Sequence, residues 1–414
     1  MATASDITVP LLDLKAQYAP IREEIRAVID EVCDAQWFVM GPHVKGLEEE
    51  LAAYTGTKHA VGCASGSDAI ILALMAHGIG CNGGHNGRVI CPSYTFFATG
   101  GSTLRLGAMP VYVDIDPVTY NMDPEKVREA AKKTDKLAAI MPVHLFGQCV
   151  DMTAYQEIAD EFGVPLIEDA AQAIGSKDET GAMAGSRGSI GCFSFFPSKN
   201  LGGFGDGGVV TTDDDELAHK MVLLRNHGME PKYYHPMLGL NSRLDALQAA
   251  VLRIKLRHLE SWHDGRRANA DFYDKAFAEA GAQTSAVALS EGGDLPLRTP
   301  ARPASDKARH IYNQYVIRVP AEHRDALRGH LGERNIGSEV YYPVPLHMQE
   351  CMAFLGQGEG SLPESERAAL ETIALPIYPE LTVEQKQHVV DSIVGYLREH
   401  AGSGAVRGSA VTAG

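Results

Sequence analysis

The segment that decides the fold is FSFFPSKNLGGFGDGG, residues 193–208. In it Lys199 leaves an apolar run and precedes a glycine-rich turn. Desolvation lowers the pKa of a lysine amine, and a less protonated amine is a better nucleophile toward an aldehyde. Glycines let the backbone pack closely against a ligand. The segment therefore predicts a lysine nucleophile beside a bound ligand, with a solvated loop lysine as the alternative.

The same segment contains a G-x-G-x-x-G match at Gly203, Gly205 and Gly208. A dinucleotide fingerprint requires a helix to open at these glycines, whereas residues 209–212 have the apolar pattern of a strand. The strand in place of the required helix therefore argues against a nicotinamide oxidoreductase.

Strand-like and helix-like runs alternate on both sides of this segment. Alternation of this kind favours a mostly parallel sheet covered by helices on both faces. Before it, apolar residues at helical spacing from Leu14 to Val32 predict an N-terminal helix entered through Pro20. The predicted strands are residues 59–64, 88–91, 110–113, 137–143, 165–167, 190–195 and 208–211, and the helices between them are residues 68–77, 124–133, 153–162 and 215–225.

Residues 244–280 keep a helical pattern with one early glycine, Gly265, and no proline. We expect this long helix to bridge a large domain, residues 1–265, and a smaller α+β domain, residues 266–400. Residues 401–414 are expected to form a flexible tail. The small domain should contain a strand at 314–319, a helix at 321–334, a strand at 338–342 and a last helix at 383–400.

The chain has 414 residues and a net charge of −16 with His counted neutral. An acidic surface disfavours nucleic acids and anionic membranes as partners. No apolar stretch is long enough to span a membrane, and residues 1–10 lack the features of a signal peptide. Without a C-x-x-C pair, the seven cysteines predict a reducing, cytoplasmic location and no metal site. Cys63, Cys91 and Cys192 are expected to be buried.

Three further motifs follow predicted strands. SGSDA at 65–69 opens an apolar helix, where Ser67 can either cap the helix or contact a phosphate. EDAAQ at 168–172 ends a buried parallel strand with two acids, only one of which can face a ligand because successive strand residues point opposite ways. The alternative for the acids is a helix N-cap. PSYTFF at 92–97 offers an aromatic ring to a planar ligand, or to the core.

Together these segments resemble the DegT/DnrJ/EryC1/StrS family of sugar aminotransferases, which are fold-type-I enzymes dependent on pyridoxal phosphate (PLP). The resemblance covers about residues 11–397. Its most specific parts are EDAAQ at 168–172, the spacing from Ser194 to Lys199 with GDGG following, and NSRLDALQAA at 241–250. It implies an α/β fold, with a mostly parallel central sheet covered by helices in the large domain and a smaller α+β C-terminal domain.

The resemblance also implies a role for each matching residue. Lys199 would form the Schiff base with PLP and move the proton during catalysis, and Asp169 would pair with the pyridine nitrogen. The other implied cofactor contacts are Gly66, Ser67 and Ser194 at the phosphate, Phe96 on the ring face, Gln172 near the ring hydroxyl, and Asn241 at the phosphate of the neighbouring subunit's cofactor.

Substrate contacts are implied as well. Arg243 would reach the substrate across the same interface, so that a homodimer shares its active sites. Tyr341, Tyr342 and His347 match positions that contact the sugar nucleotide, and packing in the small domain is the alternative for each.

The implied reaction moves an amino group from L-glutamate, which leaves as 2-oxoglutarate, through pyridoxamine phosphate to a keto group on a nucleoside-diphosphate sugar. The product would be an amino sugar for polysaccharide or secondary-metabolite glycosylation. PVHLFGQ at 142–148, with residues 241–245, is more similar to relatives acting at C3 than at C4. The sequence does not indicate which nucleotide carries the sugar. Apparent insertions at 81–87 and 285–307 could alter which nucleotide or sugar is accepted.

Two rivals follow from the same family. One is a sugar dehydratase, although relatives that dehydrate have His in place of the Schiff-base lysine. The other is a non-catalytic regulatory protein with the same fold.

Overall fold

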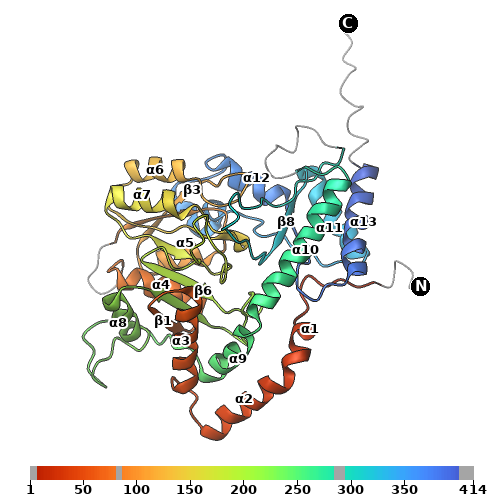
Figure 1. Cartoon of the computed structure of the whole chain (residues 1–414). Helices are drawn as coiled ribbons and strands as arrows, with labels where there is room; N and C mark the ends of the chain where they lie inside the picture. The colour runs from red at the N-terminus through yellow and green to blue at the C-terminus, as the bar shows by residue number, and fades with distance from the viewer. Residues whose placement is uncertain (1–6, 81–85, 284–293, 401–414) are drawn as a thin grey trace.

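The computed structural model describes residues 7–80, 86–283 and 294–400, and a central sheet forms its larger part (Figure 1). Hydrogen bonds order the strands β1-β7-β6-β5 and β3-β2-β4. Parallel bridges from Ile140 to Leu166 and from Val143 to Asp169 join the two groups into one surface. The strands are β1 (His59–Cys63), β2 (Arg88–Pro92), β3 (Met109–Val113), β4 (Leu137–Ile140), β5 (Ile167–Asp169), β6 (Ile190–Ser194) and β7 (Gly208–Thr212).

The predicted mostly parallel sheet is confirmed. β2 pairs in parallel with β3 and β4, and β5 pairs in parallel with β6. β7 is the exception, because it runs antiparallel to both β1 and β6. The glycine-rich loop after β6 returns the chain without a crossover helix, and a loop of this kind joins antiparallel neighbours.

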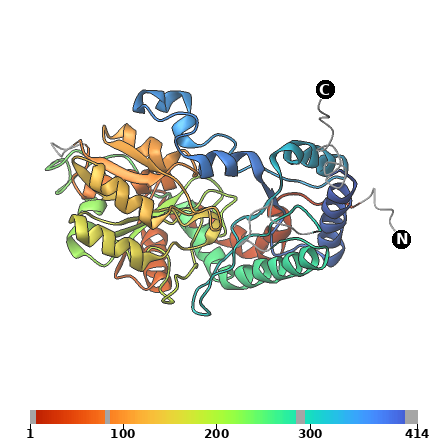
Figure 2. The same ribbon diagram turned by 90° about the horizontal axis from the view of Figure 1, so that it is seen from above.

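Helices cover both faces of the sheet, as expected (Figures 1 and 2). α4 (Gly66–Ala76) and α8 (Asp215–Leu224) pack on the face where Cys192 points, and α3 (Pro42–Thr55) and α9 (Ala246–Leu256) pack where Phe193 points. These neighbouring residues enter different cores because successive strand side chains face opposite ways. The predicted burial of Cys63, Cys91 and Cys192 is confirmed. The other helices of this part are α5 (Ala98–Arg105), α6 (Pro124–Lys133), α7 (Met152–Phe162) and the short η3 (Leu145–Gly147).

Two predicted long helices are interrupted. The N-terminal stripe forms α1 (Leu14–Tyr18) and α2 (Arg22–Ala35), separated by η2 (Ala19–Ile21). Pro20 lies in this junction, where its missing N–H and fixed φ suit a new helix start. The bridging helix is divided into α9 and α10 (Leu259–Glu279), with a tighter turn in which the N–H of His258 donates to Lys255 O. No proline or glycine marks that turn in the sequence.

The C-terminal part has its own apolar core. α10 contributes Leu259 and Trp262 to the core of the large sheet, and Ala270 and Tyr273 to the C-terminal core. Val9 joins the C-terminal core too, through a bridge to Ile336, although residues 1–265 were assigned to the large domain. The division near residue 265 stays a prediction, and residues 81–85, 284–293 and the tail 401–414 lie outside the described residues.

The secondary structure of this part differs from the prediction in one strand. β8 (Tyr315–Arg318) pairs antiparallel with β9 (Thr372–Leu375), which was not predicted. The predicted strand at 338–342 is wrong, since only Glu339 bridges to Ala374. The helices are α11 (Ala321–Glu333), η4 (Leu346–Met348), η5 (Glu350–Leu355), α12 (Pro363–Glu371) and α13 (Val383–His400). Within the described ranges, no helix is both long and apolar enough to cross a membrane.

Candidate active site

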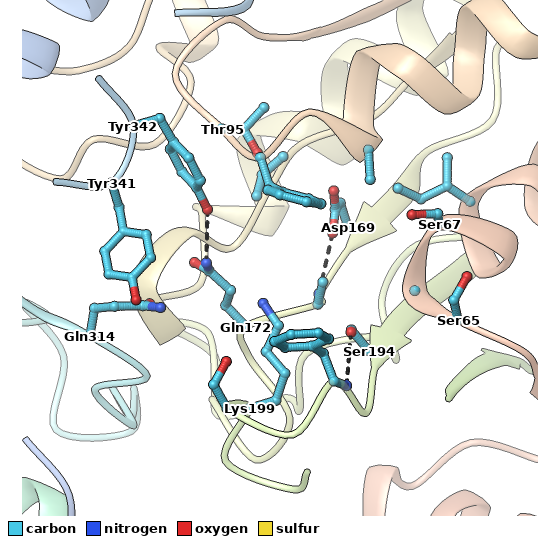
Figure 3. A pocket seen from close by; sticks show the side chains of 18 of the residues that line it. Ser65, Ser67, Thr95, Asp169, Gln172, Ser194, Lys199, Gln314, Tyr341 and Tyr342 are labelled. Carbon is cyan, nitrogen blue, oxygen red and sulfur yellow. Dashed lines mark hydrogen bonds between the residues drawn. The ribbon is translucent and has the colours of Figure 1, made fainter. Parts of the chain in front are cut away.

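A cavity of about 390 Å³ lies where β5 and β6 end and α4 begins (Figure 3). This is the edge at which open α/β sheets bind ligands, because the carboxyl ends of parallel strands meet there. Most of the predicted site residues line it, from five segments far apart in the sequence. They are Gly66, Ser67, Phe96, Asp169, Gln172, Ser194, Lys199, Tyr341 and Tyr342.

Lys199 lies in a turn just after β6, and its side chain points into the cavity (Figure 3). The turn is closed by the Lys199 N–H, which donates to Phe196 O at 2.8 Å. Burial lowers the pKa of the Lys199 amine to about 8, and the nearby Asp169 carboxylate opposes part of that decrease. About a tenth of the amine is then unprotonated at pH 7, far more than for a free lysine, and the unprotonated amine is the nucleophile.

Asp169, the last residue of β5, is 4% exposed and faces the cavity. Burial raises the pKa of its carboxyl group, and hydrogen bonds from Thr99 Oγ1 at 2.8 Å and the Ala171 N–H at 3.2 Å act in the opposite direction. The positive charge of Lys199 also favours the ionised form. This carboxylate is thus placed to accept a further cationic partner from the cavity.

Glu168 points to the other side of the sheet. It is fully buried and accepts hydrogen bonds from His144 Nε2 and from the N–H groups of Gly185, Arg187 and Gly188, at 2.6–2.8 Å. Burial alone would raise the pKa of Glu168, but these donors outweigh it and the pKa is lowered. Only Asp169 of the two acids enters the cavity, as the alternation along a strand predicts.

The other end of the cavity is a helix N-terminus. Ser65 caps α4 by accepting the Asp68 N–H at 3.1 Å, which leaves the Ser67 hydroxyl at the cavity wall. A Cβ atom at Gly66 would lie 2.7 Å from the Ser194 Cβ, so glycine is needed for the helix and β6 to approach. A helix N-terminus with the Ser67 and Ser194 hydroxyls beside it is suited to bind an anion.

A polar group occupies the wall between these ends. The Gln172 amide accepts the Phe146 N–H at 2.7 Å and donates to the Tyr342 hydroxyl at 3.0 Å (Figure 3). Tyr341 lies beside Gln314, which also lines the cavity.

Phe96 is 58% exposed although it is a large apolar side chain, and it packs obliquely against Tyr342. Its exposed ring is available to a planar ligand.

Three predicted residues do not line this cavity. Asn241 is exposed, and the Arg243 guanidinium donates to Asn226 Oδ1 at 2.9 Å. Their predicted roles concern a neighbouring subunit and stay predictions. His347 is buried between Ser93 Oγ, 2.7 Å from Nδ1, and Glu366 Oε1, 3.1 Å from Nε2. The predicted contact of His347 with the sugar nucleotide stays a prediction, with packing in the small domain as its alternative.

Sequence reasoning missed several residues of the site. Thr99 follows the quoted PSYTFF motif by two residues. It does not line the cavity, but its hydroxyl bonds to Asp169, and nothing in the sequence signals that contact. Gln314 carried no signal, because it lies just before β8 in the C-terminal part and reaches the cavity only through the fold. The remaining polar additions to the lining are Ser65, Thr95, Ser198 and Asp206.

A nucleophilic lysine, a buried carboxylate and a helix N-terminus around one cavity are the arrangement of an aminotransferase. The profile of the DegT/DnrJ/EryC1/StrS aminotransferase family matches residues 19–394. The chain belongs to this family.

Relatives and solved structures agree with that assignment. The chain is 48% identical over 95% of its length to all of a "pleiotropic regulatory protein" of Geobacillus stearothermophilus. It is 42% identical, over 91% of this chain and 95% of the relative, to UDP-N-acetyl-3-dehydro-alpha-D-glucosamine 3-aminotransferase of Acidithiobacillus ferrooxidans.

Among solved structures, DesV of S. venezuelae in complex with a ketimine intermediate is similar with a TM-score of 0.85 and 41% identity, over 94% of this chain and 98% of that one. NtdA of Bacillus subtilis with bound cofactor PMP has a TM-score of 0.82 and 29% identity, over 96% and 86%.

Proposed function

We propose that this chain is a PLP-dependent aminotransferase that moves an amino group from L-glutamate to a keto group of a nucleoside-diphosphate sugar. The observation that carries the proposal is the Lys199 amine, with its pKa near 8, in one cavity with Asp169 and the N-terminus of α4. C3 is favoured as the aminated carbon, in keeping with the 3-aminotransferase among the relatives.

The polar groups around the cavity suit the parts of the cofactor in order. The N–H groups at the start of α4, with the Ser67 and Ser194 hydroxyls, suit a phosphate. Asp169 suits a protonated pyridine nitrogen, Gln172 suits the ring hydroxyl, and the exposed Phe96 suits the ring face. Bound PLP supplies an electron-withdrawing ring that makes the α-hydrogen of an amino acid acidic.

Lys199 is the proton carrier in this proposal. Its pKa of about 8 lies near neutral pH, where a group can both accept and return a proton efficiently. Asp169 keeps its negative charge toward the ring nitrogen, helped by Thr99 and the Ala171 N–H. The Gln172 amide is oriented by Phe146 and Tyr342, so it presents one face to the cavity.

The acceptor is assigned to the side of the cavity formed by Tyr341 and Tyr342. With these rings, Asn241 and Arg243 of a second copy would complete a shared site in a homodimer. Arg243 would supply a cation for an anionic acceptor, because Lys199 is the one Lys or Arg among the residues that line the described cavity. The homodimer and the cytoplasmic location stay predictions.

A regulatory role is the second candidate, because the relative at 48% identity has a regulatory name. A regulator has no need of a reactive lysine facing a buried carboxylate. The dehydratase alternative is weakened by Lys199, since dehydrating relatives have His there.

The test combines spectroscopy with turnover. We expect a visible absorption band from bound PLP that is lost on addition of glutamate and returns with a 3-keto nucleotide sugar. Panels of UDP-, dTDP- and GDP-linked 3-keto and 4-keto sugars, with the free keto-sugars as controls, identify the acceptor. A spectrum unchanged by glutamate contradicts the aminotransferase, and equal turnover of free sugars contradicts only the nucleotide-sugar assignment.

A further inference from the structure

α9 carries a buried lysine that the proposed chemistry does not use. Lys255 is 4% exposed, and its ammonium donates to the carbonyl oxygen of Gly202 at 2.5 Å. It also lies 5.8 Å from the ring centroid of Phe204 and 5.9 Å from that of Trp262. Burial lowers the pKa of Lys255 to about 8. A buried ammonium that faces a neutral carbonyl is costly, so its contact with Gly202 is the feature to explain.

Gly202 belongs to the loop that presents Lys199. The Gly203 N–H donates to Phe195 O and the Lys199 N–H donates to Phe196 O, both at 2.8 Å, so the loop closes on itself. A Cβ atom at Gly202 would overlap the carbonyl of Pro197, which shows how closely the two backbones pack. Displacement of Gly202 would therefore be transmitted to the turn that ends at Lys199.

A second residue of α9 binds the same loop. Gln248 precedes Lys255 by seven residues, or two helical turns, and lies on the same side of the helix. Its Oε1 accepts the Phe204 N–H at 2.7 Å. Cβ atoms at Gly203 and Gly205 would come within 2.8 and 3.0 Å of the Gln248 amide, so these glycines make room for it.

We propose that Lys255, together with Gln248, is a positioning residue that fixes the glycine-rich loop and so orients the Lys199 amine toward the cofactor aldehyde. This inference rests on the proposed PLP chemistry. The proposed phosphate and ring contacts come from α4, Ser194 at the end of β6, residues 169–172 and Phe96. Lys255 bonds to Gly202 and Gln248 to Phe204, so neither binds these groups directly. Loss of the contacts should slow bond formation at Lys199 while non-covalent binding persists.

The experiment uses the full-length apo-protein and two probes. Pyridoxine 5′-phosphate has no aldehyde and reports binding alone, whereas PLP followed by borohydride and peptide mass analysis reports capture by Lys199. For Lys255→Met, we expect unchanged pyridoxine phosphate affinity and PLP capture slower by roughly tenfold or more, the scale of a misplaced reacting group. Lys255→Gln keeps a neutral donor and should recover part of the rate. Gln248→Leu should slow capture in the same selective way.

Lys386→Met is the matched control. Lys386 is also a buried lysine that donates to a neutral oxygen, Asn269 Oδ1 at 2.8 Å, beside an aromatic ring, but it belongs to α13. Lys386→Met should change neither the affinity for pyridoxine phosphate nor the rate of PLP capture. Capture at the wild-type rate in folded Lys255→Met or Gln248→Leu overturns the proposal, and so does an equal loss of pyridoxine phosphate binding. Failure of the wild-type protein to bond PLP at Lys199 would instead reject the proposed function.

Discussion

Thr99 donates a hydrogen bond from Oγ1 to Oδ2 of Asp169 at 2.8 Å, and both side chains are buried. Among the contacts that oppose the burial-induced rise in the pKa of Asp169, this bond is the largest. Asp169 must be ionised to hold a protonated ring nitrogen. Thr99 therefore acts on the proposed chemistry through Asp169, although it does not itself line the cavity.

Thr99→Val keeps the shape of the side chain and removes the donor. Because the bond favours the ionised carboxylate, its loss should raise the pKa of Asp169 further. Activity that needs ionised Asp169 would then be lost at a higher pH, so the acidic limb of the kcat profile should move upward. Thr103→Val is the control, since Thr103 Oγ1 bonds only to the Thr99 carbonyl in this helix, at 3.1 Å. An unmoved acidic limb in Thr99→Val contradicts this role.

The two acids at the end of β5 should respond differently to amidation. Asp169→Asn should fold normally and lower kcat far more than it weakens glutamate binding, because the ring nitrogen loses its anionic partner. Glu168→Gln should keep its activity when folded but lower the free energy of unfolding by about 1–3 kcal/mol, because an NH2 group then faces buried N–H donors. Steady-state kinetics measure the effect on kcat, and urea unfolding measures the effect on stability. If Glu168→Gln is inactive and Asp169→Asn keeps a near-normal kcat, Glu168 is the partner of the ring nitrogen instead.

Glu168 also predicts a pH dependence of stability. Its pKa in the folded protein is lowered, since the donors from His144 and the backbone outweigh burial. A depressed pKa stabilises the fold above the ordinary pKa of Glu, and this contribution is lost as the pH falls toward the lowered value. The stability difference between wild type and Glu168→Gln should therefore shrink below the ordinary pKa. A constant difference across the acidic range would rule out this linkage.

Lys199 predicts the pH dependence of cofactor capture. Since its pKa is about 8 rather than that of a free lysine, the rate of PLP capture by apo-protein should rise with pH and level off above about 8. Lys199→Ala should fold and show no capture. A rate that keeps rising toward pH 10, or borohydride trapping at a different lysine, would contradict the assignment.

The sequence predicts the strand ends that form the site better than the contacts between distant segments. The placement of Lys199, Asp169 and Ser67 follows from strand alternation and from the rule that parallel strands end at one edge. Gln314 and the Lys255–Gly202 bond could not be predicted, since they depend on how the C-terminal part and α9 pack on the loop. The bond between His347 and Ser93 could not be predicted either, because the two residues are 254 positions apart in the sequence.

The last prediction concerns a site shared between two subunits. Asn241 and Arg243 do not line the cavity of their own chain, and a two-fold dimer would bring them to the partner's Lys199. Suppose that Lys199→Ala and Arg243→Ala are each inactive. Co-refolding equal amounts places about half of the molecules in mixed dimers, where one site carries both changes and the other carries neither, so about a quarter of all sites are unaltered.

Activity near a quarter of the wild-type value is therefore expected from the mixture, measured after mass spectrometry has shown that mixed dimers form. The competing arrangement has Arg243 serving its own subunit, as its bond to Asn226 within the chain would allow. Every site would then carry one change, and mixing would restore nothing. An exposed change such as Lys232→Ala, paired with Lys199→Ala, is a suitable control, and that mixture should reach about half of the wild-type activity because half of all sites keep Lys199.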